Sequence, residues 1–244
     1  MDVQSYGSKN DRAQSETQHD LPRLLDEAAR KCGLDRTSWH IQSKGDEQLA
    51  VTPMNGDEPR LVDDYVRHLV AGLGHYNAQR VPTARMRLRA ALHHGPVALA
   101  DNGFAGTAVV VTARLLNSGP LYGALDAHPE ADLALILSDD MYRSTVAGGH
   151  TTLVPSDFSR VAVSVKEYES AAYITVPTLG APAATGNSLT GTTGTGTTGT
   201  GTTGTGTTGT GAGHDYRADR INVTHMNGPV DARGAVFGFG SADA

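Results

Sequence analysis

Residues 87–116 read RLRAALHHGPVALADNGFAGTAVVVTARLL, and this stretch decides the fold. From Met86 to His93, apolar residues alternate with arginine, alanine and histidine, which is the pattern of a half-buried strand. A tight turn and a second short strand follow, and the apolar residues before Leu116 then fit a helix packed on a sheet. The stretch therefore predicts a strand, a turn, a short strand and a helix that ends on a buried Arg114.

The sequence before this stretch predicts two helices and a hairpin. Asp20-Leu21-Pro22 is a favourable helix start, and apolar residues then recur at helical spacing until Gly33. Two β-prone pieces within residues 39–51 flank the turn at Lys44-Gly45-Asp46, which indicates a β-hairpin. A second helix is expected from about Glu58 to Asn77, with one apolar stripe.

The sequence after this stretch continues the alternation of strands and helices. Residues 132–137 form a short apolar run, which favours a buried strand, and Asp139-Asp140 then begins another helix at its acidic end. Alternating valines at 161–165 and the β-prone residues 171–176 predict a closing hairpin. Interleaved helices and strands predict a layered α/β or α+β sheet domain over residues 1–176.

Composition narrows the classes of function. The chain has 244 residues and a net charge of -6, so no basic stripe is available for nucleic acid. A single cysteine, Cys32, fits a reducing compartment, and no apolar run reaches the roughly 20 residues that cross a bilayer. The polar residues 1–20 lack the apolar core of a signal peptide. We therefore expect a cytoplasmic protein that binds neither nucleic acid nor membrane.

The last third of the chain has a different character. Residues 177–213 are rich in Pro, Thr and Gly, include repeated GTTGT pentads, and contain almost no apolar side chain, so we expect a flexible, disordered linker. Residues 214–244 hold two β-prone pieces around Asn227-Gly228-Pro229 and Arg233-Gly234. This tail is too short for a core of its own, and its apolar residues suggest that it binds something.

Five segments of residues 1–176, in order, resemble the catalytic domain of class III nucleotidyl cyclases, in particular the divergent actinobacterial cyclase-like domains. The segments are MDVQSYG, KGDEQLAV, RLRAALHHGPV, GTAVVVTARLL and VAVSVKEYESAAYITV. The resemblance implies a ferredoxin-like βαββαβ cyclase-type sheet with helices packed on it. It also implies a nucleotide-binding lyase that converts a nucleoside triphosphate to a cyclic nucleotide and pyrophosphate as a homodimer.

The resemblance also assigns roles to single residues. Asp2 and Asp46 match the family's two metal-binding aspartates, which hold two Mg²⁺ or Mn²⁺ ions; such ions can activate the 3′-hydroxyl and neutralise the triphosphate. Arg114 matches the transition-state arginine that reaches across the dimer, and Lys166 matches a lysine that contacts the triphosphate. A turn aspartate, a structural arginine and a solvated lysine are the alternatives. Only Met1 precedes Asp2, where the family has a whole strand.

Three positions depart from the family's pattern. Val110 stands where an asparagine orients the ribose, and valine cannot hydrogen-bond a sugar. The base-selecting lysine falls on Gln42, and its acidic or small partner falls near Gly103. These departures are compatible with a cyclase of unusual base preference and with a decayed, non-catalytic copy. The adjacent His93 and His94 are not expected to share a metal, because neighbours on a strand point to opposite faces.

The tail resembles the short amyloid-signalling motifs at the C-termini of actinobacterial effectors. Such a motif would stack in cross-β form with a like motif on a partner, for example a nucleotide-binding receptor. The alternative is an unstructured tail with incidental aromatic residues. The candidate self-assembly residues are Asn222, Val223, His225, Gly228, Val230, Gly234, Val236, Phe237 and Phe239.

Two hypotheses of function follow. In the first, the domain is a cyclase-like effector that the tail recruits and clusters, which raises the local concentration and favours the dimer. In the second, the domain is catalytically inactive and serves as a dimerisation or nucleotide-sensing module in a signalling assembly. An orphan domain with a disordered extension is a third possibility.

Overall fold

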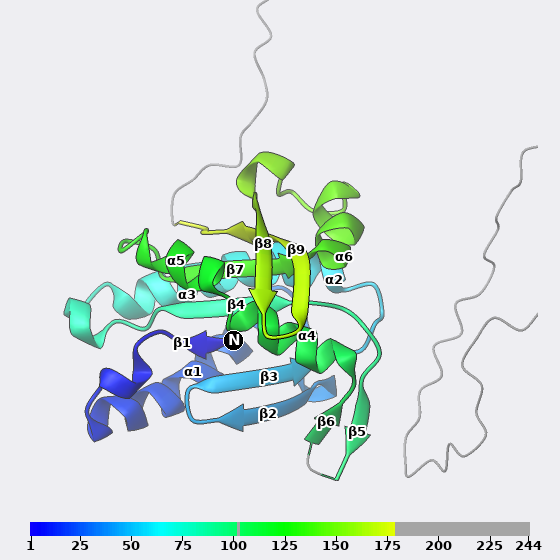
Figure 1. Ribbon diagram of the computed structural model, residues 1–244. Helices are drawn as coiled ribbons and strands as arrows, with labels where there is room; N and C mark the ends of the chain where they lie inside the picture. The colour runs from blue at the N-terminus through cyan, green and yellow to red at the C-terminus, as the bar shows by residue number, and fades with distance from the viewer. Residues whose placement is uncertain (102, 179–244) are drawn as a thin grey trace, which may run out of the picture. The chain divides into compact units, whose positions relative to one another are not determined.

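The structure, a computed structural model, describes residues 1–101 and 103–178. Its centre is a mixed five-stranded sheet of order β1-β4-β7-β9-β8 with helices packed on it (Figure 1). The strands are β1 (Asp2–Val3), β4 (Leu88–Leu92), β7 (Leu133–Ser138), β8 (Ser159–Val165) and β9 (Tyr168–Thr175). Strands β4 and β7 are parallel, and the other neighbouring pairs are antiparallel. Residues 1–178 therefore form an α+β fold, as the sequence predicts.

Two smaller sheets and several helices complete the described residues. The smaller sheets pair β2 (His40–Lys44) with β3 (Glu47–Val51), and β5 (Ala98–Ala100) with β6 (Gly103–Ala105). The helices are α1 (Asp11–Lys31), α2 (Glu58–Arg60), α3 (Val66–Asn77), α4 (Thr107–Leu116), α5 (Gly119–Asp126) and α6 (Asp139–Tyr142). Short 3-10 turns cover Tyr6–Ser8, Arg36–Ser38, Pro82–Ala84 and Pro155–Asp157, and π-helical turns cover Leu61–Tyr65 and Arg143–Ala147. None of the helices described here is long and apolar enough to cross a membrane.

Helix α1 begins earlier than its sequence predicts. Its first residue is Asp11, and the Asn10 side chain caps it by accepting a hydrogen bond from the Ala13 N–H at 2.9 Å. The expected start at Asp20 is therefore wrong, and Pro22 lies inside the helix. Apolar spacing starts only in the second half of α1, so the polar first half gives no helical signal. The expected end is confirmed, because Gly33 follows with a positive φ of 73°.

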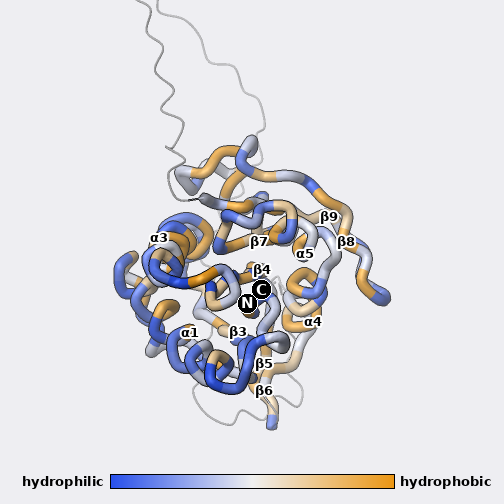
Figure 2. The backbone as a smooth tube through the Cα atoms, turned by 90° about the vertical axis from the view of Figure 1, so that its left-hand side faces the viewer, coloured by the Kyte–Doolittle hydropathy of each residue, from blue (hydrophilic) through white to orange (hydrophobic). Residues whose placement is uncertain are grey.

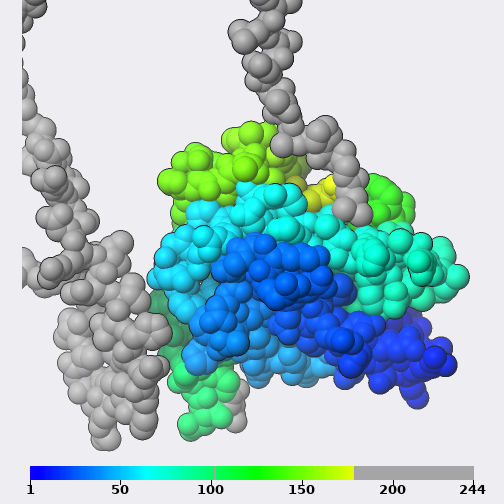
Figure 3. Space-filling view, turned by 180° about the vertical axis from the view of Figure 1, so that it is seen from behind, coloured from blue at the N-terminus to red at the C-terminus, as the bar shows by residue number. Residues whose placement is uncertain are grey.

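The second predicted helix is confirmed over residues 58–77. It consists of α2, the π-helical turn that includes Tyr65, and α3, which ends at Asn77. Helices α1 and α3 pack side by side over one face of the molecule, as the blue and cyan residues of Figure 3 show. Their buried stripes, which include Leu25 and Leu69, join the core beneath them.

The sheet has a hydrophobic core on each face. Leu88 and Leu135 belong to the core under α1 and α3, whereas Ala91 and Ile136 belong to the core under α4 and α5. In Figure 2 the apolar strands β4 and β7 lie between the helices, and α1 turns a hydrophilic surface outward. The expectation of a half-buried strand at β4 is wrong, because its residues face a helix layer on both sides and only Leu92 is partly exposed. The buried strand β7 is confirmed.

The hairpin β2–β3 is confirmed and continues the sheet beyond β1. Its two-residue turn, Gly45-Asp46, connects the paired residues Lys44 and Glu47, and Gly45 has the positive φ of 62° that a type II′ turn requires at its first position. Met1 and Gln48 then exchange both backbone hydrogen bonds, at 2.9 and 3.0 Å, as an antiparallel pair does. Strand β3 therefore lies beside β1.

The crossover between β4 and β7 contains the rest of the opening stretch of sequence. The single short strand expected there is instead a hairpin, β5–β6, and α4 follows it. Helix α5 then leads back to β7. The last residue of β7, Ser138, is the N-cap of α6, which begins at Asp139-Asp140 as the acidic pair predicts. The closing hairpin β8–β9 is also confirmed, with Val165 paired to Tyr168.

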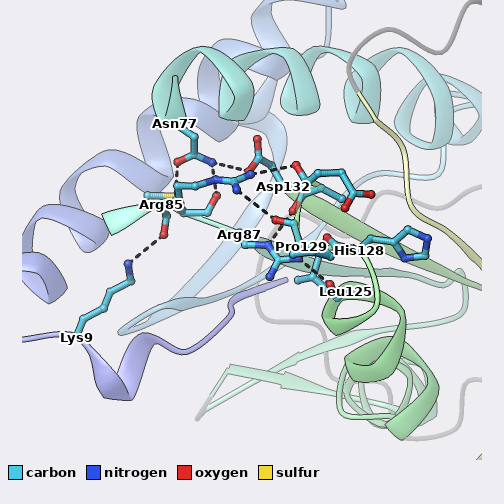
Figure 4. A network of polar contacts seen from close by, with 11 residues as sticks. Lys9, Asn77, Arg85, Arg87, Leu125, His128, Pro129 and Asp132 are labelled. Atoms are coloured by element: carbon cyan, nitrogen blue, oxygen red, sulfur yellow. Dashed lines mark hydrogen bonds and ion pairs between the residues drawn. The ribbon is translucent and has the colours of Figure 1, made fainter. Parts of the chain in front are cut away.

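A polar network fixes the end of the sheet where β4 and β7 begin (Figure 4). The buried Asn77 side chain accepts from the Met86 N–H and donates to the Met86 carbonyl and to Asp132, each at 2.8 Å. Arg85 donates to the same Asp132 carboxylate at 2.5 Å. Arg87 donates to three carbonyl groups, those of Leu125, His128 and Ala131, in and after the last turn of α5. Helices α3 and α5 are therefore attached to the starts of both parallel strands.

Candidate functional site

Trp39, strand β2 and the β5–β6 hairpin border an open groove of about 540 Å³. Gln42 and Gly103 meet in it: a Cβ atom added to Gly103 would lie 3.0 Å from the Gln42 Oε1 atom. Gly103 has a φ of 117°, a backbone angle that residues other than glycine rarely adopt. The remaining lining residues are Trp39, His40, Ile41, Leu99, Ala100 and Phe104. The groove therefore combines apolar surfaces with a side-chain amide that can donate and accept hydrogen bonds.

Of the two predicted metal ligands, one lies in β1 and the other in the turn of the β2–β3 hairpin. Asp2 is on β1, and its carboxylate is mostly buried, with 14% of the side chain exposed. Both of its oxygens accept hydrogen bonds from Arg89 on β4, at 3.0 Å from Nε and 2.6 Å from Nη2. The Arg89 guanidinium also lies 3.5 Å from the centre of the Tyr122 ring, so it is held between a carboxylate and an aromatic face.

Burial and charge act in opposite directions on Asp2. Burial is the largest effect and raises the pKa of its carboxyl group, whereas Arg89 lowers that pKa. The negative charge of Asp46 raises the pKa of Asp2 further, so the two carboxylates lie within electrostatic reach of each other. Asp46 itself is half-buried in the β2–β3 turn.

Arg114 and Lys166 form a second group at the turn of the β8–β9 hairpin. The Arg114 Nη2 atom lies 3.1 Å from a carboxylate oxygen of Glu167, whose side chain is 76% exposed. The buried Arg114 Nε has no hydrogen-bond partner among the described residues. Lys166, exposed beside Glu167, occupies the turn with a φ of 55°. Val110 lies one helical turn before Arg114, and it is 46% exposed.

The structure therefore places the predicted residues in three pairs. Gln42 is beside Gly103, Asp2 is near Asp46, and the turn that carries Lys166 contacts Arg114. No described contact joins these pairs within one chain. The candidate residues of the tail, from Asn222 to Phe239, lie outside the described residues, as do the linker residues from 179 onward.

Two further residues were not expected from the sequence. Arg89 is found only through the strand register, which pairs it with Asp2. Ser138 is found through the parallel pairing of β4 and β7, which brings its hydroxyl to 2.9 Å from Nδ1 of His93.

Ser138 forms a hydrogen bond with the His93 ring. Its hydroxyl oxygen also accepts from the Met141 N–H at 3.2 Å. The hydroxyl can donate to Nδ1 of a neutral His93 whose proton is on Nε2, and its second lone pair can equally accept from a protonated Nδ1. Burial, and to a smaller extent His94, lower the pKa of His93, while Asp140 raises it. The neutral ring is therefore favoured. The His93 and His94 rings are tilted, with their centroids 6.2 Å apart.

Comparison of the chain with protein-family models, curated proteins and solved structures found no match.

Proposed function

We propose that the chain is a class III nucleotidyl cyclase-like module that binds a nucleoside triphosphate. The observation that carries this proposal is the meeting of Gln42 and Gly103 in one groove. The resemblance assigns the two positions that select the base to these residues, which are far apart in the sequence. A groove that combines the aromatic residues Trp39 and Phe104 with the Gln42 amide suits a planar nucleobase, because the rings can stack on the base and an amide can pair with its donor and acceptor edge.

The order of the strands supports the same proposal. Strand β1 pairs antiparallel with β4, and β2 pairs antiparallel with β3. Met1 and Gln48 join β1 to β3 in the same sense. The resulting spatial order is β4-β1-β3-β2. Helix α1 connects β1 to β2, and the α2–α3 helix connects β3 to β4. This order is the one expected for a ferredoxin-like βαββαβ unit, and it supports our proposal that β1 to β4 form such a unit. Strands β7, β8 and β9 would then extend that unit beyond β4.

We propose that Asp2 and Asp46 would hold the two Mg²⁺ or Mn²⁺ ions. The negative charge of Asp46 raises the pKa of Asp2, and a divalent cation between the two carboxylates would relieve this repulsion. Arg89 occupies part of the Asp2 carboxylate, which offers about four lone-pair positions in all. When bound, the ions would supply activation of the 3′-hydroxyl and neutralisation of the triphosphate charge.

Arg114 and Lys166 would bind the triphosphate. The Arg114 guanidinium is held by one exposed carboxylate, that of Glu167, and a solvated pair of this kind is weak enough for phosphate oxygens to replace it. Because the three pairs of residues are separate within one chain, we propose a homodimer in which the Arg114 side of one chain completes the Asp2 side of the other.

A second function is favoured by Val110. The exposed helix face before Arg114 presents this valine where a sugar-binding amide would be needed. The module would then sense the nucleotide without turning it over. In either form, we propose that the tail from Asn222 to Phe239 recruits it through cross-β stacking with a similar motif, for example on a nucleotide-binding receptor.

One experiment separates the two functions. The purified full chain is incubated with each of the four nucleoside triphosphates and Mn²⁺, and cyclic product and nucleotide binding are measured in parallel. The control variant is Asp11→Ala, because Asp11 is an exposed aspartate of α1. Cyclic product that is lost in Asp46→Ala but retained in Asp11→Ala supports the cyclase. Nucleotide binding without product supports the sensing module. Absence of both product and binding would refute the proposal in both forms.

A further inference from the structure

We propose that the outer edge of strand β8 is an interface with a second copy of this chain, in which the two β8 strands pair antiparallel about Ala162. Strand β8 is the last strand of the five-stranded sheet, and within residues 1–101 and 103–178 it pairs only with β9. Alternate backbone N–H and C=O groups of β8 therefore face away from the sheet, where another strand can bind them. The interface would join the sheets of two copies into one continuous sheet.

This edge lacks the features by which proteins usually prevent strand pairing. The residues of β8 include no proline, glycine or lysine, and Arg160 is their only charged residue. Ser159, Arg160, Ala162 and Ser164 are exposed, so no described segment covers this face of the strand. A regular, exposed edge strand without such protection is a template for another strand.

The sequence of β8 is complementary to itself in this register. Pairing about Ala162 places Val161 of one copy opposite Val163 of the other. Both valines belong to the core under α4 and α5, and Val161 is only partly buried there, so the valine pairs would extend this core across the two-fold axis. Arg160 then lies opposite Ser164, whereas pairing about Val163 would place Arg160 opposite Lys166.

The charges beside the edge favour the same register. Ser164 pairs with Glu169 of β9, and a carboxylate oxygen of Glu169 lies 3.4 Å from the Ser164 hydroxyl oxygen. Arg160 of the other copy arrives opposite Ser164 on the same face of the sheet, and its long side chain therefore reaches this carboxylate. In the described part of a single chain, neither Arg160 nor Glu169 forms an ion pair. The two-fold axis would form the new ion pair twice.

This interface goes beyond the proposed function, because it uses a different part of the molecule. Asp2 lies on β1, at the other end of the strand order, and Arg114 reaches only Glu167, which follows the last residue of β8. Two separate interfaces on one chain allow assemblies larger than a dimer. A ladder of seven residues is small for an interface, so the association through β8 alone should be weak.

Disulfide cross-linking of the full chain tests the register, in a Cys32→Ser background that removes the native cysteine. Directly opposite residues of an antiparallel pair have Cα atoms about 4.5–5.5 Å apart, a separation that a disulfide can span. Ala162→Cys is therefore expected to give a covalent dimer under mild oxidation. The control Ser164→Cys should give none, because its two copies lie roughly 13 Å apart along the strands. A mixture of Ser164→Cys with Arg160→Cys should cross-link.

Sedimentation equilibrium of the full chain tests whether the edge drives association. Ala162→Lys places two like charges opposite each other and is expected to weaken association about tenfold. The control is Ala71→Lys, at an exposed position of α3, which should associate as the original chain does. Arg160→Glu should weaken association about three- to tenfold, and Arg160→Glu/Glu169→Arg should restore it to within about twofold.

Two outcomes would overturn the proposal. One is equal cross-linking of Ala162→Cys and Ser164→Cys, or no cross-linking of Ala162→Cys, because the two copies would then not pair about Ala162. The other is an equal average mass for Ala162→Lys and Ala71→Lys. Neither outcome bears on nucleotide binding, which is measured separately.

Discussion

Asp2 and Arg89 face each other across the β1–β4 pair, and the Arg89 guanidinium binds both oxygens of the Asp2 carboxylate. This pair lies on the sheet face that α5 covers, because Tyr122 of that helix packs on the guanidinium. It connects the proposed metal ligand to the core, so the site and the stability of the fold depend on the same side chain.

Removal of Arg89 should destabilise the protein strongly. Arg89→Met leaves the Asp2 carboxylate buried without its partner, and we expect the free energy of unfolding to fall by about 3 kcal/mol. Urea unfolding measures this loss. The double variant Asp2→Asn/Arg89→Met should recover part of it, and Arg12→Met, which breaks an exposed pair, should change stability by less than about 0.5 kcal/mol. Equal urea midpoints for Arg89→Met and the original chain would contradict the importance of this pair.

Asn77 should be equally sensitive, although it is far from the site. Asn77→Ala removes three hydrogen bonds and leaves the Met86 N–H without its side-chain partner, so a loss of about 2–3 kcal/mol is expected. Thermal or urea unfolding provides the measurement. Asn55→Ala, at an exposed turn, is the control and should be close to neutral. A neutral Asn77→Ala would show that the network is not needed to hold α3 on the sheet.

Substitution of Gly103 should affect both stability and nucleotide binding. In Gly103→Ala, the new Cβ would press on the Gln42 amide in a backbone conformation that alanine disfavours, at a cost of about 1–2 kcal/mol. Nucleotide binding should weaken together with stability. Gly123→Ala, in α5 with open space around it, should instead stabilise the protein by about 0.5–1 kcal/mol and leave binding unchanged. If Gly103→Ala is destabilised but binds nucleotide with normal affinity, the nucleotide does not bind in this groove.

His93 should make stability depend on pH. Burial lowers the pKa of His93 below its ordinary value of 6.5, so the unfolded chain takes up this proton more readily than the folded one. Stability should therefore fall as pH decreases below about 6.5 and continue to fall through the lowered pKa. Urea midpoints measured at several pH values should show a flatter profile in His93→Gln, whereas His19→Gln, at an exposed position, should retain the original slope. Parallel profiles for the original chain and His93→Gln would rule out His93 as the cause.

The sequence predicts those parts of the fold in which a local pattern is sufficient. The apolar run of β7 has no alternative to burial, the glycine of Gly45-Asp46 permits the hairpin turn, and the 58–77 helix has a continuous stripe. The start of α1 and the two-sided burial of β4 were missed. In both cases the decisive interaction, the cap by Asn10 or the partner of Arg89, does not appear in the periodicity of apolar residues.

The candidate site was predictable only in part for the same reason. The resemblance identified Gln42 and Gly103 as positions, and the packing of two hairpins determines that they meet. The register that joins Asp2 to Arg89 and the hydrogen bond between His93 and Ser138 depend on tertiary contacts between distant segments. No spacing of residues in the chain indicates such contacts.

The parallel pairing of β4 with β7 has a consequence for the order of folding. The three hairpins join residues that are close in the sequence, so they can form early and independently. The pairing of Leu88 with Leu133 must close a long loop that contains a hairpin and two helices. The transition state should therefore be reached only when the two central strands meet, and mutations in the early-formed hairpins should mainly slow folding.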